Sequence, residues 1–227
     1  MIMSPPCHIV LVGDSDISRW PPELFPSPST NAAFSVVRNG LSGAVLDETI
    51  SLVSETLRDA IACTATKTAA TEKNAPSTSR IIVVICAGEN DIGQGYSIDK
   101  IIRSFERVVD ECFGFEVPVS RMIYLGPKIE PWLTHDPSSR KQYVKLSKSL
   151  QRAIERHNRK ADIHYIDCLL MFCGESAKIP GAVTAKAKAE ERYFHNDGLH
   201  LSDEGYSILK QVIEDEVNKI LLATDTV

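Results

Sequence analysis

The chain has 227 residues, of which 43% are hydrophobic and 24% are charged, a composition typical of a globular protein with one substantial core. Its net charge of −5 argues against a nucleic-acid-binding surface, which would need clustered lysine and arginine. We therefore expect a single domain over residues 1–227 and no nucleic-acid partner.

The start of the sequence predicts no targeting segment. Residues 1–6 contain no lysine or arginine, and the apolar run that follows them is only about five residues long. A run of that length is too short for a signal peptide and far too short to span a membrane. We expect a cytoplasmic protein without stable membrane insertion, or one whose leader has been removed.

Five short apolar runs predict β-strands, because each is rich in Ile, Val or aromatic residues and is bounded by polar residues, Gly or Pro. The runs are His8–Val12, Phe34–Val37, Ile81–Cys86, Met122–Leu125 and Ile163–Ile166. Helix-like segments lie between or after them, at Leu46–Ala62, Ser97–Cys112, Ser138–Asn158 and Asp203–Leu222. The alternation predicts parallel βαβ units and a sheet covered on both faces.

Two irregular stretches interrupt this pattern. Thr64–Ser79 is rich in Thr, Ala, Lys and Ser without periodicity, which predicts an exposed and mobile connection. Cys173–Phe194 contains Gly and Pro, and it is either a loop over the site or a long surface excursion.

The six cysteines are scattered, without a Cys-x-x-Cys motif or a histidine at zinc-finger spacing. We expect reduced thiols, several of them in core strands, and neither a metal nor a cofactor. The cysteines are Cys7, Cys63, Cys86, Cys112, Cys168 and Cys173.

The first apolar run ends at Gly13 and is followed at once by Asp14 and Ser15. A serine at the carboxyl end of a buried strand is well placed to be a nucleophile, although Gly-Asp-Ser is also ordinary turn chemistry. A nucleophilic serine needs a general base, a group that orients the base, and donors for the oxyanion.

Candidates for these parts follow other predicted elements. In an open parallel sheet of order 2-1-3-4-5, strands one and three flank the reversal of strand order, which would place Ser15 and Asn90 at one crevice. An Asn amide there suits an oxyanion, although a loop cap would explain Asn90 alone. Asp197 and His200 are three residues apart, so one loop can bring a carboxylate onto an imidazole, although incidental polar residues in a loop before a helix would also fit.

Together these blocks resemble the SGNH (GDSL-type) hydrolase superfamily over nearly the whole chain. The matching segments are Gly13-Asp14-Ser15, Gly43, Gly88-Glu89-Asn90-Asp91 and Asp197-Gly198-Leu199-His200. The resemblance implies a flavodoxin-like α/β/α sandwich with three layers, and ester hydrolysis through a serine acyl-enzyme without a metal. The chain has no Gly-x-Ser-x-Gly elbow, which disfavours the α/β-hydrolase fold.

Position by position, the resemblance implies that Ser15 is the nucleophile, His200 the base and Asp197 the group that orients it. It implies an oxyanion hole made by the backbone N–H groups of Ser15 and Gly43 and by the Asn90 side chain. We prefer Gly43 to Gly40 because Leu-Ser-Gly preserves the family spacing after the strand.

Other residues beside these motifs carry weaker expectations. We expect Asp14 and Asp91 to brace their loops through backbone hydrogen bonds. The segment Gly126–Trp132 looks like a loop that lines the pocket in bacterial members of the family. Trp20, Trp132 and Phe194 are candidate pocket aromatics, although each could equally pack in the core. Asp16 departs from the Leu or Ile of many members, and it would either disfavour an anionic substrate or point into a hydrogen-bonded turn.

The sequence thus predicts a serine esterase that acts on a small-molecule carboxylic ester, with short-chain acyl or acetyl esters favoured. Two alternatives use the same fold. One is an acyltransferase, in which an alcohol replaces water in the second step, and the other is a non-catalytic ligand-binding module. The acyl and alcohol specificity and the oligomeric state stay open.

Overall fold

The computed structural model describes residues 7–28, 34–68, 80–116, 119–178 and 187–224. Its centre is a five-stranded parallel sheet in the order β2-β1-β3-β4-β5. The strands are β1 (Cys7–Gly13), β2 (Phe34–Gly40), β3 (Arg80–Cys86), β4 (Val119–Leu125) and β5 (Ile163–Ile166). The predicted strand order and direction are both confirmed.

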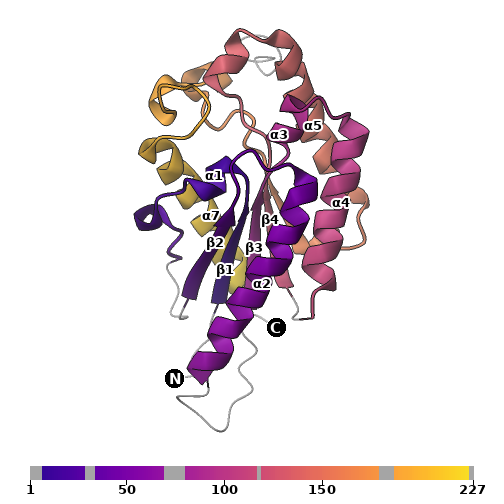
Figure 1. The fold of residues 1–227 in the computed structure, drawn as a ribbon. Coiled ribbons are helices and arrows are strands. Elements are labelled where there is room, and N and C mark those ends of the chain that lie inside the picture. The colour runs from indigo at the N-terminus through magenta and orange to yellow at the C-terminus, as the bar shows by residue number, and fades with distance from the viewer. Residues whose placement is uncertain (1–6, 29–33, 69–79, 117–118, 179–186, 225–227) are drawn as a thin grey trace.

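Helices lie on both faces of the sheet, which gives the three layers expected from the sequence (Figure 1). The α-helices are α1 (Ser15–Ser18), α2 (Leu46–Thr68), α3 (Glu89–Gly93), α4 (Ile98–Gly114), α5 (Pro137–Arg156) and α7 (Asp203–Thr224). Short 3₁₀ helices are η1 (Pro22–Leu24), η2 (Pro131–Thr134), η3 (Lys160–Asp162), η4 (Gly174–Lys178) and η5 (Glu191–Tyr193).

The core forms two hydrophobic clusters because successive side chains of a strand point to opposite faces of the sheet. Val10 and Val12 of β1 pack in the cluster that includes the apolar stripes of α2, α4 and α5. Ile9 and Leu11 pack in the other cluster, which includes α7. All seven residues of β1 are buried, as expected for a central parallel strand.

The register aligns the carboxyl ends of the strands at one edge of the sheet. Gly13 pairs with both Gly40 and Cys86, Cys86 pairs with Leu125, and Leu125 pairs with Ile166. The loops that follow these strands therefore start side by side, and the polar motifs of the sequence lie in three of them.

The irregular stretches are described only in part. The helix predicted at Leu46–Ala62 continues in the structure as α2 to Thr68, and residues 69–79 lie outside the described residues. Cys173–Phe194 contains η4 and η5, and residues 179–186 lie outside the described residues.

The described cysteines Cys7, Cys86, Cys112, Cys168 and Cys173 are all free and buried, whereas the Cys63 side chain lies outside the description. Within the described ranges, no helix has both the length and the apolar character that crossing a membrane requires.

Candidate active site

The turn after β1 places Ser15 at the first position of α1. Gly13 lies so close to β3 that a Cβ on it would be 1.9 Å from the Cys86 carbonyl oxygen, so a side chain does not fit there. The Asp14 N–H donates to that carbonyl at 3.0 Å, and the Asp14 carboxylate accepts from the Asp16 N–H at 3.1 Å. Asp14 therefore braces the turn, as predicted, and leaves Ser15 half-buried at the sheet edge.

The loop after β2 is fastened to the same turn. The Leu41 N–H donates to the Gly13 carbonyl at 3.0 Å. A Cβ on Gly40 would lie 2.2 Å from the backbone nitrogen of Ser18, whereas a Cβ on Gly43 would meet nothing within 4 Å. Gly43 instead has a left-handed φ of +80°. Among the described residues the Gly43 N–H has no acceptor, so it is available to a bound group.

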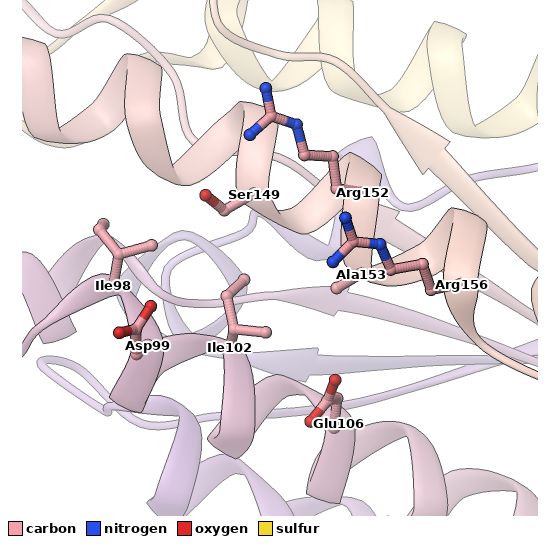
Figure 2. A pocket seen from close by; sticks show the side chains of 8 residues that line it. All are labelled: Ile98, Asp99, Ile102, Glu106, Ser149, Arg152, Ala153 and Arg156. Atoms are coloured by element: carbon pink, nitrogen blue, oxygen red, sulfur yellow. The ribbon is translucent and has the colours of Figure 1, made fainter.

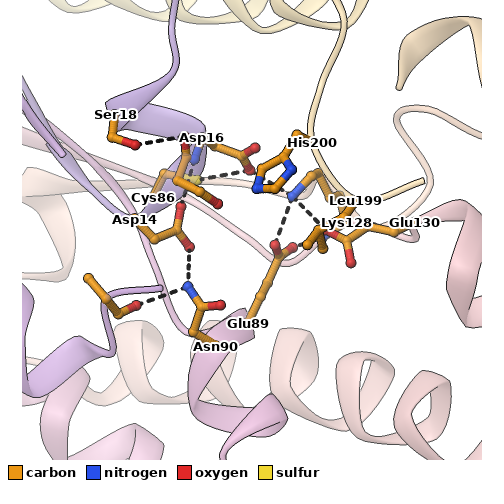
Figure 3. Close-up of polar contacts among 12 residues, drawn as sticks. Asp14, Asp16, Ser18, Cys86, Glu89, Asn90, Lys128, Glu130, Leu199 and His200 are labelled. Carbon is orange, nitrogen blue, oxygen red and sulfur yellow. Dashed lines mark hydrogen bonds and ion pairs between the residues drawn. The ribbon is translucent and has the colours of Figure 1, made fainter. Parts of the chain in front are cut away.

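Asn90, in the first turn of α3, joins these two loops. Its Nδ2 donates to the Ala44 carbonyl at 3.1 Å and, over a longer 3.4 Å, to Asp14 Oδ2 (Figure 3). Gly88 before it has a left-handed φ of +115°, which turns the chain sharply from β3 into α3. The fold thus brings the Ser15 turn, the Gly43 loop and the Asn90 amide together.

Asp91 braces the start of α2 from behind Asn90. Its Oδ2 accepts from the Leu46 N–H at 3.0 Å, and the residue is 1% exposed. Burial raises the pKa of Asp91 to about 6. The role predicted for Asp91, a backbone brace, is confirmed.

The loop before α7 forms a carboxylate–imidazole pair. Asp197 Oδ2 lies 2.6 Å from His200 Nδ1, and Asp197 Oδ1 accepts from the backbone N–H groups of His200 and Leu199. The His200 side-chain hydrogen bond, followed by these backbone bonds, lowers the pKa of Asp197 well below its usual range. An ionised Asp197 orients the ring so that Nε2 is the free nitrogen.

The His200 ring points toward the turn that holds Asp14 and Asp16 in Figure 3. Within the described part of the chain, no hydrogen bond joins Ser15 to the His200 side chain. Nucleophile–base hydrogen bonds are often open in a ligand-free site and tighten when substrate binds. The structure therefore holds the Asp197 carboxylate and the His200 imidazole in contact, and among the described residues it shows no hydrogen bond from Ser15 to that imidazole.

A buried ion cluster lies beside the turn, and sequence reasoning missed it. Lys128, three residues beyond β4, places its Nζ 2.6 Å from Asp16 Oδ2, 2.8 Å from Glu89 Oε2 and 3.0 Å from Glu130 Oε1 (Figure 3). The exposed fractions of the Lys128, Asp16 and Glu130 side chains are 5% or less. The segment expected to line a pocket places Lys128 and Glu130 in this cluster, and its Pro131 lines a cavity.

The charges in the cluster do not balance, because three carboxylates surround one ammonium group. Burial raises the pKa of Glu130 to about 8 despite the nearby ammonium, and it also raises the pKa of Glu89. Burial alone would lower the pKa of Lys128, but the carboxylates of Asp16, Glu130 and Glu89 raise it well above its usual range. Lys128 therefore stays charged, and Glu130 keeps its proton at neutral pH.

Asp14, Asp16 and Cys86 place one potential metal-ligating atom each within 4.8 Å of one another. The Lys128 ammonium already supplies a positive charge at Asp16. Burial, which the negative charges of Asp14 and Asp16 reinforce, raises the pKa of the Cys86 thiol well above its usual range. The group of two carboxylates and one thiol carries no further observation that points to a metal, and we assign none to it.

A cavity of about 240 Å³ adjoins the loop before α7 that contains Asp197 and His200, which we call the histidine loop. Its lining residues are Pro131, Glu191, Phe194, His195, Asn196 and Gly198. Of the three candidate pocket aromatics, Phe194 lines this cavity. Trp132 is half-buried and donates to Glu130 Oε2 at 2.5 Å, whereas Trp20 is 0% exposed and packs against Tyr206 in the core.

A larger cavity of about 370 Å³ lies between α4 and α5. Figure 2 shows Arg152 and Arg156 of α5 across from Asp99 and Glu106 of α4. None of the predicted site residues lines this larger cavity, so we do not assign the predicted reaction to it.

The comparison with protein families identifies one family over most of the chain. The model of the GDSL-like lipase/acylhydrolase family matches residues 13–208, which include Ser15, Gly43, Asn90, Asp197 and His200. Among curated proteins, none matches the chain.

Solved structures share the fold at low sequence identity. A GDSL-like lipase from Bacteroides thetaiotaomicron is 17% identical with a TM-score of 0.62, covering 93% of this chain and 88% of its own. A lipase/acylhydrolase from Enterococcus faecalis is 17% identical with a TM-score of 0.57, covering 93% of this chain and 95% of its own. A carbohydrate esterase family 3 protein from Talaromyces cellulolyticus is 12% identical with a TM-score of 0.59, covering 95% and 98%.

Proposed function

The chain belongs to the GDSL-like lipase/acylhydrolase family, and on that premise we propose that it is a serine esterase of carboxylic esters. Ser15 is the nucleophile, His200 is the general base, and Asp197 orients the base. The oxyanion is bound by the N–H groups of Ser15 and Gly43 and by the Asn90 amide.

The observation that supports this proposal most is the 2.6 Å contact between Asp197 Oδ2 and His200 Nδ1. A carboxylate on Nδ1 fixes the tautomer in which Nε2 accepts a proton, and it stabilises the imidazolium that then forms. The low pKa of Asp197 suits this role, because the carboxylate stays ionised while His200 gains and loses its proton.

In the acylation half, His200 Nε2 takes the proton of the Ser15 hydroxyl as Oγ attacks the acyl carbonyl. The tetrahedral intermediate collapses, the C–O bond to the alcohol breaks, and the His200 proton passes to the departing alkoxide. In the second half, His200 takes a proton from water as the water oxygen attacks the acyl carbon. The bond from that carbon to Ser15 Oγ breaks, the acid leaves, and the His200 proton returns to Oγ.

Donation to the oxyanion requires a rearrangement of Asn90. Both of its amide hydrogens are engaged, toward Ala44 and toward Asp14. The bond to Asp14 Oδ2 is the longer of the two, at 3.4 Å, and an amide turned away from it could donate to the oxyanion while keeping the Ala44 carbonyl. At 3.4 Å this hydrogen bond is at the long end of the normal range, so its release costs less than release of the 3.1 Å bond to Ala44.

The preference for short acyl chains rests on placing the acyl group in the cavity beside the histidine loop. The cavity of about 240 Å³ there lies below the roughly 300–1,000 Å³ of sites for drug-sized ligands. The lining side chains of Glu191, His195 and Asn196 are polar, which disfavours a long alkyl chain.

A series of p-nitrophenyl esters, from acetate to long-chain acyl groups, tests the proposed substrate class. We expect kcat/KM to be highest for the shortest chains and to fall as the chain lengthens. A preference for long chains would contradict the short-chain assignment, and turnover of none of the esters would contradict the esterase.

A further inference from the structure

We propose that Lys128 is a positioning residue of the esterase. Through its buried ion pairs with Asp16 and Glu89 it holds two turns in place: residues 13–18, which contain Ser15, and residues 88–91, which contain Asn90. This inference rests on the proposed function, because it assigns Lys128 a part in that same reaction.

The ion pairs reach the residues next to the proposed catalytic groups. Asp16 directly follows Ser15, and Glu89 directly precedes Asn90. Lys128 contacts Glu89 twice, since its backbone N–H also donates to Glu89 Oε1 at 2.7 Å. One side chain after β4 is therefore bound to the turns that follow β1 and β3.

The ammonium group has no spare donor. It carries three N–H bonds, and three carboxylate oxygens lie within 3.0 Å of its nitrogen. Hydrogen bonds to charged groups are stronger than neutral ones, and burial shields them from water. Each turn is thus held by a directional contact with little freedom to move.

The same segment also contacts the histidine loop. Glu130, the third partner of Lys128, accepts from Trp132 Nε1. Pro131, which lies between these two residues in the sequence, packs against Gly198. A Cβ on Gly198 would be 3.3 Å from the Pro131 Cβ. The loop that carries Asp197 and His200 therefore rests on the segment that Lys128 anchors.

Removal of the ammonium would release both turns. The carboxylates of Asp16 and Glu89 would lose their buried counterion, and they would separate or take up protons. Because a misplacement of about 1 Å can lower a rate about 100-fold, we expect the Lys128→Met variant to lose about 100-fold in kcat. KM should change little, because Lys128 is buried and does not face the substrate.

The test combines kinetics with hydrogen exchange on the full chain. The Lys128→Met variant is assayed with p-nitrophenyl acetate from pH 5 to 9, and kcat is calculated per molecule of folded protein. Amide exchange is measured over 13–18 and 88–91, where we expect it to rise by about tenfold or more. Lys219→Met is the matched control, because Lys219 pairs with Glu216 and its side chain is 71% exposed. It should match the wild type in both measurements.

The proposal is overturned if Lys128→Met keeps the kcat and the pH profile of the wild type per folded molecule, even if it melts at a lower temperature. That result would make Lys128 a purely structural residue. Exchange that rises equally throughout the chain, with kcat unchanged, leads to the same conclusion.

Asp16→Leu provides the second test if Lys128→Met fails to fold. It removes one ion pair and places an apolar side chain in the space, so exchange should rise over 13–18 and not over 88–91, with a lower kcat. Unchanged exchange and kcat would overturn the proposal. If Ser15→Ala remains active, the esterase mechanism fails, whereas the exchange data still decide whether Lys128 holds the two turns.

Discussion

Lys128 Nζ lies 2.6 Å from Asp16 Oδ2 although the two residues are 112 positions apart in the chain, and both side chains are about 95% buried. This contact answers the question that the sequence left open about Asp16. Its carboxylate points into an ion cluster rather than toward substrate. The residue beside the proposed nucleophile therefore acts on the position of its turn.

The excess of buried carboxylate predicts a pH-dependent stability. Glu130 has a pKa of about 8 in the folded chain, compared with about 4.3 in an unfolded one, so the folded state binds its proton more tightly. This contribution to the free energy of unfolding is complete below about pH 4.3 and is lost as the pH rises through about 8.

The Glu130→Gln variant should remove that dependence while keeping an oxygen that accepts from Trp132. We expect its free energy of unfolding, measured with urea, to fall less between pH 5 and pH 8 than that of the wild type. Glu204→Gln is the control, since the Glu204 side chain is 52% exposed. Equal slopes for wild type and Glu130→Gln would show that Glu130 does not hold a proton in the folded chain.

The Asp197–His200 pair predicts the effect of losing the carboxylate charge. Asp197→Asn keeps the size of the side chain but favours the wrong imidazole tautomer, and we expect kcat to fall by about 10⁴ with little change in KM. The assay is p-nitrophenyl acetate hydrolysis. A variant with more than about a tenth of the wild-type kcat would exclude Asp197 as the orienting group.

The Asn90 amide is predicted to stabilise the oxyanion. Loss of one oxyanion donor costs about 10²–10³ in kcat, so Asn90→Ala should be impaired to that extent while it remains folded at 25 °C. Circular dichroism checks the fold, and Asn158→Ala at an exposed position is the control. Wild-type turnover by Asn90→Ala would remove this residue from the site.

The two glycines of the second loop should respond differently to alanine. A Cβ on Gly40 would lie 2.2 Å from the backbone nitrogen of Ser18, the last residue of α1. The Gly40→Ala variant must therefore displace α1, and its melting temperature should fall strongly. Gly43→Ala meets no atom and bears only the left-handed strain of about 1–2 kcal/mol. Thermal melts of both variants measure the difference, and equal melting temperatures would contradict the close packing at Gly40.

Much of the fold follows from local patterns in the sequence. Short apolar runs predicted each strand, but the run at Phe34–Val37 ended before β2 does. The strand continues through Arg38 and Asn39 to Gly40, because pairing with β1 does not require apolar side chains at the sheet edge. In the same way, the Thr-rich end of α2 has weak helix propensity and was expected to be irregular.

The ion cluster could not be predicted because nothing in a linear pattern pairs Asp16 with Lys128. A contact between residues more than a hundred positions apart in the sequence depends on where β1 and β4 end in the sheet. In addition, a lysine that follows a strand is usually exposed to solvent. For a similar reason the sequence left Trp20 open between a pocket and the core, since its partner Tyr206 comes from the helix at the other end of the chain. An acidic residue next to the serine was the one available signal.

The most direct test of the esterase mechanism is the turnover of p-nitrophenyl acetate by Ser15→Ala, compared with wild type and with Ser207→Ala in α7. Ser207 donates to a backbone carbonyl within its helix, so its loss should leave turnover unchanged. We expect Ser15→Ala to lose at least about 10⁴ in kcat and to form no acyl adduct by mass spectrometry. Substantial turnover by Ser15→Ala would contradict the account.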